Sequence, residues 1–376
     1  MGVGLYIHIP FCKSKCMYCD FCSFSGKENM MMEYTHALSK EILIAGRGRS
    51  IETVFIGGGT PTYLSLEAWE LIGQSLRELN IKDKAEFTVE CNPGTIEVDK
   101  LNMLKKIGVN RISIGLQAWQ DRLLKGIGRI HTKDQFVESF KMVRAYGFNN
   151  INVDIMFGLP NQTLKDLKET IEEVAKLNPE HISCYSLIVE ENTHFGKMYE
   201  RGELKLPDED LEREMYDESV RLLGENGYKQ YEISNFSKEG FQCKHNIKYW
   251  KAEEYIGCGL AAHGYLDGVR YRNEENIKKY IKIVNETGLS TVESYKNTMK
   301  DNIEEFMFMG LRMTKGVSED EFYNRFGISI WKLYEEVINK FIKLNYLEYK
   351  DRHLSIKSKA LGISNSIMCE FILDKE

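Results

Sequence analysis

The sequence predicts an α/β fold in which six strand–helix units form a parallel sheet, open or curled into a partial barrel, followed by a smaller helical domain. Three observations support this prediction. Short runs of β-branched and apolar residues alternate with amphipathic segments through the first half of the chain. Such alternation is typical of parallel sheets with helical crossovers. The alternation stops near residue 190, and from about residue 301 the pattern is mainly helical.

The six expected strands are short apolar runs at residues 4–9, 53–57, 86–91, 111–115, 152–157 and 181–187. The amphipathic segments between them predict helices at residues 34–45, 66–79, 99–107, 132–146 and 164–177. In folds of this kind, functional side chains gather where strands end and loops begin. Cysteines, glycines and charged residues fall at these strand ends, so we look for the functional site there.

The second half of the chain has a different pattern. A polar, turn-rich stretch at 190–210 precedes a helical pattern at 211–226 and a strand-like and loop region at 230–264. Predicted helices at 303–313, 318–326 and 330–344 then precede two strand-like runs at 346–350 and 353–356. Helices followed by a two-stranded ribbon suggest a winged-helix-like domain. We therefore divide the chain into residues 1–190 (barrel), 191–300 (barrel extension) and 301–376 (C-terminal domain).

Composition excludes several classes of protein. The 376 residues carry a net charge of −6 without a long basic run, so no nucleic-acid interface is expected. No apolar stretch is long enough to span a membrane, and the start lacks the pattern of a signal peptide. Contact with a membrane surface stays open. The nine cysteines are odd in number and scattered, so we do not expect disulfides. We expect instead a reducing, cytoplasmic setting.

Three cysteines follow the first predicted strand as a C-x3-C-x2-C run: Cys12, Cys16 and Cys19. Three thiolates on one loop can hold three irons of a [4Fe–4S] cluster and leave the fourth iron open to a ligand that is not protein. A structural zinc site takes four protein ligands and would need a second pair of ligands at C-x2-C or H-x3-5-H spacing. The nearest match to such a pair in this sequence is poor. Cys22 is either a fourth ligand or a spare thiol.

A glycine-rich loop, Gly57-Gly58-Gly59-Thr60-Pro61, directly follows the second predicted strand. Glycines let a ligand approach the backbone, and their amides can bind a carboxylate or phosphate. The loop lacks both the spacing of a dinucleotide-binding turn and the lysine of a P-loop. The alternative is a tight turn between strand and helix.

Four polar residues from separate strand–helix units lie near strand ends: Glu90, Gln117, Arg129 and Asp154. Asp154 lies within an apolar strand, where an unpaired carboxylate would be costly to bury. Arg129 could bind a carboxylate through two hydrogen bonds. Each residue alone is more often structural than a ligand, but four such positions together favour a shared site.

These motifs together resemble the radical S-adenosylmethionine (SAM) superfamily, and within it the coproporphyrinogen dehydrogenase-like group. The resemblance is carried by residues 6–12, 16–21, 57–61, 90–93 and 157–160 and covers the whole chain. It implies a partial (β/α)6 radical SAM barrel that binds a [4Fe–4S] cluster through Cys12, Cys16 and Cys19. SAM would chelate the open iron through its amino and carboxylate groups.

The resemblance also assigns roles to the remaining candidates. Gly58, Gly59 and Thr60 match the loop that holds the methionyl end of SAM. Four further residues match positions that contact SAM: Glu90, Gln117, Arg129 and Asp154. Tyr6 matches a position beside the cluster.

A second motif comes after the barrel, where Cys243-Lys-His245-Asn246-Ile-Lys-Tyr249-Trp250 fits the H-N-x-x-Y-W pattern associated with haem binding in HemW-type haem chaperones. Histidine nitrogen and cysteine thiolate are both known axial ligands of haem. Tyr249 and Trp250 could stack on a flat macrocycle. The alternative is that His245 and Asn246 cap a loop while the two aromatic residues join the core.

Two functions compete within the group. The dehydrogenase oxidatively decarboxylates two propionates of coproporphyrinogen III, whereas the chaperone binds haem and passes it to apo-haemoproteins. The dehydrogenase pattern has a fourth cysteine where this chain has Phe21, and it has an extension before the first strand for which this chain has no room. Together with the motif at His245, these differences predict a haem chaperone with a cluster, SAM and haem as cofactors. Whether it turns over a substrate stays open, as does a weaker third possibility, a radical SAM enzyme acting on another porphyrin.

Overall fold

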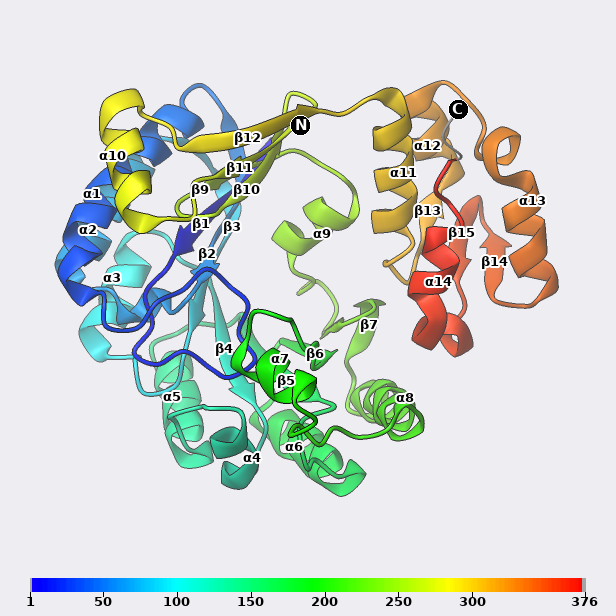
Figure 1. Ribbon diagram of the computed structural model, residues 1–376, viewed down its shortest axis with the longest axis horizontal. Helices are drawn as coiled ribbons and strands as arrows, with labels where there is room; N and C mark the ends of the chain where they lie inside the picture. The colour runs from blue at the N-terminus through cyan, green and yellow to red at the C-terminus, as the bar shows by residue number, and fades with distance from the viewer. Residues whose placement is uncertain (1, 374–376) are drawn as a thin grey trace.

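The computed structural model describes residues 2–373 and contains one 12-stranded sheet and one three-stranded sheet (Figure 1). The large sheet has the strand order β12-β11-β10-β9-β1-β2-β3-β4-β5-β6-β8-β7. Its strands are β1 (Val3–Ile9), β2 (Ser50–Gly58), β3 (Asn80–Cys91), β4 (Arg111–Gln117), β5 (Ile151–Phe157), β6 (His181–Ser186), β7 (Lys229–Glu232), β8 (Asn235–Ser237), β9 (Tyr255–Cys258), β10 (His263–Leu266), β11 (Val269–Asn273) and β12 (Thr291–Lys296).

Strands β1 to β6 pair in parallel and in chain order, which confirms the six predicted strand–helix units and the partial barrel. The helices of this region are α1 (Met31–Gly46), α2 (Leu66–Arg77), α3 (Val98–Lys106), α4 (Asp121–Gly126), α5 (Lys133–Ala145), α6 (Leu164–Leu177), α7 (His194–Glu200), α8 (Glu209–Glu225), α9 (Lys244–Trp250) and α10 (Ile277–Thr287), with short 3-10 turns η1 (Glu28–Met30) and η2 (Pro61–Tyr63). Because the crossovers are helical, the carboxyl ends of all six strands meet at one edge.

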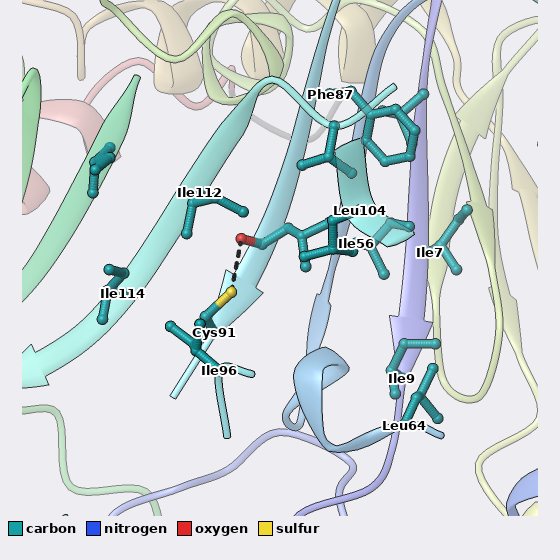
Figure 2. Close-up of a cluster of buried hydrophobic side chains, with 14 of the residues drawn as sticks. Ile7, Ile9, Ile56, Leu64, Phe87, Cys91, Ile96, Leu104, Ile112 and Ile114 are labelled. Carbon is teal, nitrogen blue, oxygen red and sulfur yellow. Dashed lines mark hydrogen bonds between the residues drawn. The ribbon is translucent and has the colours of Figure 1, made fainter. Parts of the chain in front are cut away.

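Apolar side chains hold the sheet against its outer helices. Ile56 of β2, Ile112 of β4 and Leu104 of α3 are all fully buried in one cluster (Figure 2). Burying a side chain of this size contributes about 2 kcal/mol.

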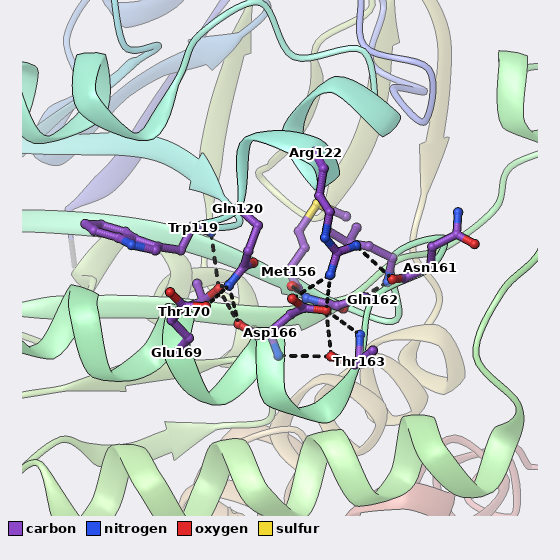
Figure 3. Close-up of polar contacts among 11 residues, drawn as sticks. Trp119, Gln120, Arg122, Met156, Asn161, Gln162, Thr163, Asp166, Glu169 and Thr170 are labelled. Carbon is purple, nitrogen blue, oxygen red and sulfur yellow. Dashed lines mark hydrogen bonds and ion pairs between the residues drawn. The ribbon is translucent and has the colours of Figure 1, made fainter.

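Local capping sets where the helices begin near the strand ends. Thr163 and Asp166 form a capping box at the start of α6, and Arg122 of α4 donates to both oxygens of Asp166 at 2.6 Å (Figure 3). Arg122 also donates to the carbonyl of Asn161 at 3.1 Å. These contacts fix the turn that connects β5 to α6.

The C-terminal domain has its own apolar core and a winged-helix-like order of elements, as predicted. Its elements are α11 (Met299–Gly310), β13 (Val317–Ser318), α12 (Glu319–Phe326), α13 (Ile330–Lys343), β14 (Leu347–Lys350), β15 (His353–Ile356), η3 (Ser358–Ile363) and α14 (Ser364–Cys369). The small sheet has the order β13-β15-β14. The short strand β13 was not predicted.

Two backbone hydrogen bonds join this domain to the barrel. Thr314 N donates to Tyr231 O and Ile233 N donates to Arg312 O, each at 3.1 Å. We call these paired segments, residues 231–233 and 312–314, the interdomain strap. The Arg312 guanidinium also lies 4.5 Å from the ring centre of Trp250 in α9.

Elements after residue 190 were the least well predicted. The stretch 190–210 contains the helix α7, which was not predicted. Earlier in the chain, α4 was also not predicted. Strand β9 adds to β1 in parallel, and β10, β11 and β12 extend that edge in antiparallel fashion. Among the residues that the structure describes, no helix is long and apolar enough to cross a membrane.

Candidate functional site

A cavity of about 700 Å³, open to solvent, lies where the carboxyl ends of the barrel strands meet the cysteine loop. Nine of its lining residues were predicted as site residues: Cys12, Cys16, Cys19, Gly58, Gly59, Glu90, Gln117, Arg129 and Asp154. They come from six separate chain segments in or after the strands β1 to β5, and the parallel topology brings them to one edge. Tyr6 and Thr60 lie close by but do not line this cavity.

The three cysteines of the loop all face the cavity. Thr60 Oγ1 donates to Cys12 Sγ at 3.6 Å, and burial raises the pKa of the thiols of Cys12 and Cys19. Nowhere in residues 2–373 do three or more His, Cys, Asp or Glu side chains lie close enough to hold one metal ion. A [4Fe–4S] cluster takes one cysteine per iron, so its ligands are spread wider than those of a single ion. Three cysteine thiolates on one loop fit such a cluster.

Cys22 points away from the cavity. Its Sγ donates to the carbonyl of Glu275 at 3.7 Å, and its own carbonyl lies 2.9 Å from His8 Nε2. The neighbouring Phe21, 64% exposed, lines the cavity instead. This orientation favours a spare thiol over a fourth ligand.

The glycine loop is built for close approach. Gly58 has a φ of 106°, and a Cβ there would lie 2.4 Å from the His8 ring. A Cβ on Gly59 would lie 2.8 Å from the Phe11 carbonyl and 3.0 Å from Cys12 Sγ. Only glycine therefore fits at either position, and the loop lies directly against the cysteine loop.

Two carboxylates face the cavity from β3 and β5. Glu90 accepts a hydrogen bond from Gly58 N at 3.1 Å. Burial is the main cause that raises the Glu90 pKa to about 7, and the negative charge of Asp154 is the second. Burial also raises the pKa of Asp154, which accepts from Asn152 Nδ2 at 2.7 Å. A cationic ligand would stabilise both carboxylates in their charged form.

Two cationic residues line the same cavity, Lys15 of the cysteine loop and Arg129. Arg129 donates to Asn92 Oδ1 at 2.8 Å and to the Gly115 carbonyl at 3.1 Å, and its buried Nε has no hydrogen-bond partner in the described chain. Gln117, at a φ of 74°, accepts a hydrogen bond from the Tyr185 hydroxyl at 3.3 Å. A guanidinium opposite two carboxylates suits a ligand that carries both signs of charge.

Tyr6 lies beneath the cavity, on β1. Its hydroxyl lies 2.9 Å from His8 Nδ1, and burial lowers the His8 pKa to about 4. His8 is therefore neutral and, with Nε2 donating to Cys22, fixes the base of the cysteine loop.

His245 lies on α9, where it packs against Thr53 and Phe55 of β2, and it does not line the cavity. It is 1% exposed, and its Nδ1 and Nε2 each lie 2.8 Å from a hydroxyl, that of Thr53 and that of Tyr249. Its ring centre is 5.3 Å from that of Phe55, and burial lowers its pKa to about 3. The structure does not bring His245 into the cavity, and both of its ring nitrogens are engaged.

Several lining residues were not predicted, among them Tyr18, Asn92, Ser113 and Tyr185. Asn92 follows the end of β3, and Tyr185 is the penultimate residue of β6. The rule that site residues gather at strand ends could have found both. Tyr18 lies between two of the motif cysteines, where only the motif's position in the fold could have indicated it.

Comparisons with known proteins agree with this geometry. Residues 6–174 match the model of the radical SAM superfamily, and residues 297–361 match that of the HemN C-terminal domain. The chain is 40% identical to a protein of Bacillus subtilis (strain 168) named heme chaperone HemW, over 98% of both chains. It is 39% identical to a protein of the same name from Lactococcus lactis, over 98% of this chain and 97% of that protein.

One solved structure also resembles the whole chain. It is coproporphyrinogen III oxidase (HemN) from Escherichia coli, described as a radical SAM enzyme. The TM-score is 0.87 at 22% identity, covering 99% of this chain and 90% of that one. At this identity the likeness shows the fold. With the nearly full-length similarity to the two HemW proteins, we conclude that the chain belongs to the HemW family of the radical SAM superfamily.

Proposed function

We propose that this protein is a haem chaperone, which binds a [4Fe–4S] cluster, SAM and haem and delivers the haem to apo-haemoproteins. The observation that carries the proposal is the identity of about 40% to proteins named heme chaperone over nearly their whole length. The nine free cysteines suit a reducing compartment, and we place the protein in the cytoplasm.

The cavity supports the cofactor assignments. Cys12, Cys16 and Cys19 would hold the cluster, whose open iron and electron supply the redox chemistry when it is bound. The glycine loop would hold the methionyl end of SAM against the cysteine loop, because Gly59 lies directly against Phe11 and Cys12 with no side chain of its own in between. Glu90 and Asp154 would face the positive charges of SAM, and Arg129 its carboxylate.

The haem site is a separate question. His245 stays a prediction as an axial ligand, because ligation of iron would require it to give up its hydrogen bond to Thr53 or to Tyr249. The bond to Thr53 is buried and the bond to Tyr249 is partly buried, so opening either would cost roughly 1–3 kcal/mol.

Transfer of haem is the direct test of the proposed function. We expect cluster-loaded protein carrying haem to convert a purified apo-haemoprotein to its holo form faster than an equal concentration of free haem does. The measurement is the rise of the acceptor's own absorbance or activity under anaerobic conditions.

A second assay addresses the dehydrogenase alternative. Cluster-loaded protein is incubated with SAM, a reductant and coproporphyrinogen III, and protoporphyrinogen and 5′-deoxyadenosine are measured by chromatography. We expect no decarboxylated product above a control without SAM. Product in that assay, or no acceleration of haem transfer, would contradict a chaperone that does not act on coproporphyrinogen.

The raised pKa of Glu90 gives SAM binding a pH dependence. Below its pKa of about 7 the free carboxyl is protonated, and the proton must leave before the carboxylate can face a cation. We therefore expect SAM affinity to rise with pH and to be about tenfold weaker at pH 6 than at pH 8. Equilibrium dialysis of labelled SAM against cluster-loaded protein measures this.

Glu90→Gln is the matched variant. It keeps the shape and removes the titrating group, so the dependence that remains belongs to SAM's own amino group and to Asp154. We expect a flatter profile and weaker binding at pH 8. An identical slope in the two proteins would show that Glu90 does not contact SAM.

A further inference from the structure

A second and larger hollow separates the barrel from the C-terminal domain. It encloses about 1760 Å³, counting the part open to solvent. One wall comes from the end of β6, the loop after it and α8, and the other from Arg312 and residues 361–365. In Figure 1, α14 of the C-terminal domain lies above α8 of the barrel region. We call it the interdomain cleft.

The walls of the cleft are largely apolar and aromatic. Leu187, Tyr216, Ile233 and Leu361 line it, and two further lining residues, Ile188 and Tyr199, are 69% and 61% exposed. Exposed apolar side chains gathered around a hollow are typical of ligand sites, which often lie between domains. A broad, flat, mostly apolar molecule would cover them.

Two arginines supply positive charge at the cleft. Arg213 of α8 has one near acidic partner, Asp210 at 3.7 Å, and its side chain is 58% exposed. Arg312 lies 3.7 Å from the carboxylate of Glu232, and its buried Nε has no hydrogen-bond partner within residues 2–373. Guanidinium groups favour carboxylates, which they bind through paired hydrogen bonds.

Two glutamates also line the cleft, Glu209 and Glu212. Glu212 accepts a hydrogen bond from Ser186 Oγ, which occupies one of its oxygens. Glu209 lies in the first turn of α8, where the helix dipole stabilises its charge. Neither glutamate pairs with Arg213 or Arg312. The acidic partners of these arginines are Asp210 and Glu232, each at 3.7 Å, which is longer than a hydrogen-bonded ion pair and leaves guanidinium N–H groups for a ligand carboxylate.

Tyr185 connects the cleft to the cofactor cavity. Its side chain lines both hollows, and its hydroxyl donates to Gln117 Oε1 on the cavity side. A molecule in the cleft would thus be separated from the cofactor cavity by one aromatic ring.

From these observations we infer that the interdomain cleft binds haem, with the apolar face of the macrocycle on the aromatic walls and the two propionates toward Arg213 and Arg312. The inference rests on the proposed function and names its binding site. Docking in this cleft needs no iron ligand from His245, which is buried elsewhere. A porphyrin without iron should therefore bind as well.

Gly362 allows a direct test. It lines the cleft, and a Cβ added there would meet only Arg213 Cγ, at 3.9 Å. Gly362→Trp should therefore fill the cleft without straining the backbone. Gly224→Trp is the matched control, since Gly224 lies on α8 with open space around it and away from the cleft.

The measurement is the dissociation constant of haem and of metal-free protoporphyrin IX for full-length, cluster-loaded protein. We expect Gly362→Trp to weaken both at least tenfold and Gly224→Trp to leave both within twofold of wild type. Arg213→Gln should weaken both, whereas Arg221→Gln, on the same helix but outside the cleft, should not. Circular dichroism and cluster content show whether each variant is folded.

The outcomes separate the site from the function. If wild type binds and delivers haem but Gly362→Trp binds it equally well, the cleft is overturned and the chaperone function stands. If wild type binds haem but not metal-free protoporphyrin IX, an iron ligand is required and the cleft is again overturned. If wild type fails to bind or deliver haem, the proposed function falls first.

Discussion

Cys16→Ala is expected to abolish binding of the [4Fe–4S] cluster. Cys16 lies between Cys12 and Cys19 in the loop, and all three side chains face the cavity. With one thiolate removed, two irons lack protein ligands, and a cluster held by two cysteines is lost on purification. Iron and sulfide analysis after anaerobic reconstitution measures the effect, and we expect near-complete loss of both.

Cys22→Ala is the control on the same loop. Its Sγ bonds the Glu275 carbonyl and does not line the cavity, so cluster content should match wild type. Loss of iron from Cys22→Ala, or a full cluster in Cys16→Ala, would show that the ligands have been assigned wrongly.

The second large effect is expected for His245→Ala, in the stability of the fold. The substitution removes a buried ring and leaves the hydroxyls of Thr53 and Tyr249 without their partner in the core. A cavity together with unpaired buried groups typically costs about 3 kcal/mol or more. Urea unfolding followed by tryptophan fluorescence should show the lower free energy of unfolding.

Lys244→Ala is the matched control, because Lys244 precedes His245 on α9 and its side chain is exposed. Its stability should stay within about 0.5 kcal/mol of wild type. Tyr249→Phe should lie between the two, since it removes one of the two partners of the ring. An unchanged unfolding curve for His245→Ala would contradict a structural role.

This expectation changes how haem binding by His245→Ala should be interpreted. A loss of haem in a destabilised protein does not by itself identify an iron ligand. Haem affinity should therefore be compared between His245→Ala and Tyr249→Phe at a temperature where both are folded. If only the histidine variant loses haem while metal-free porphyrin still binds, the prediction of His245 as ligand gains direct support.

The six parallel strands could be predicted because each carries its own signal. Each is a short apolar run, and the observed bounds of β1 and β5 differ from the predicted ones by one residue. The pairing of β9 with β1 could not be predicted in this way. It joins segments about 250 residues apart, such as Tyr6 and Gly257, and short strands of ordinary composition do not identify a distant partner.

The gathering of the candidate site residues at one cavity could be anticipated from the sequence better than the packing around α9 could. Residues such as Glu90 and Asp154 are placed by the topology of the sheet, which brings strand ends together whatever the side chains are. His245 depends instead on what α9 packs against. The pattern H-N-x-x-Y-W is equally compatible with a ligand and with a buried hydrogen-bonded ring, and the nearby hydroxyl of Thr53 comes from a strand 192 residues earlier.

The interdomain strap has a kinetic consequence. Because backbone hydrogen bonds at residues 231–233 and 312–314 join the two domains, the cleft is already formed before a ligand arrives. A preorganised site loses little conformational entropy on binding and needs no slow closing step. Ligands should therefore enter at similar rates, and selectivity among porphyrins will be set by how long each one stays.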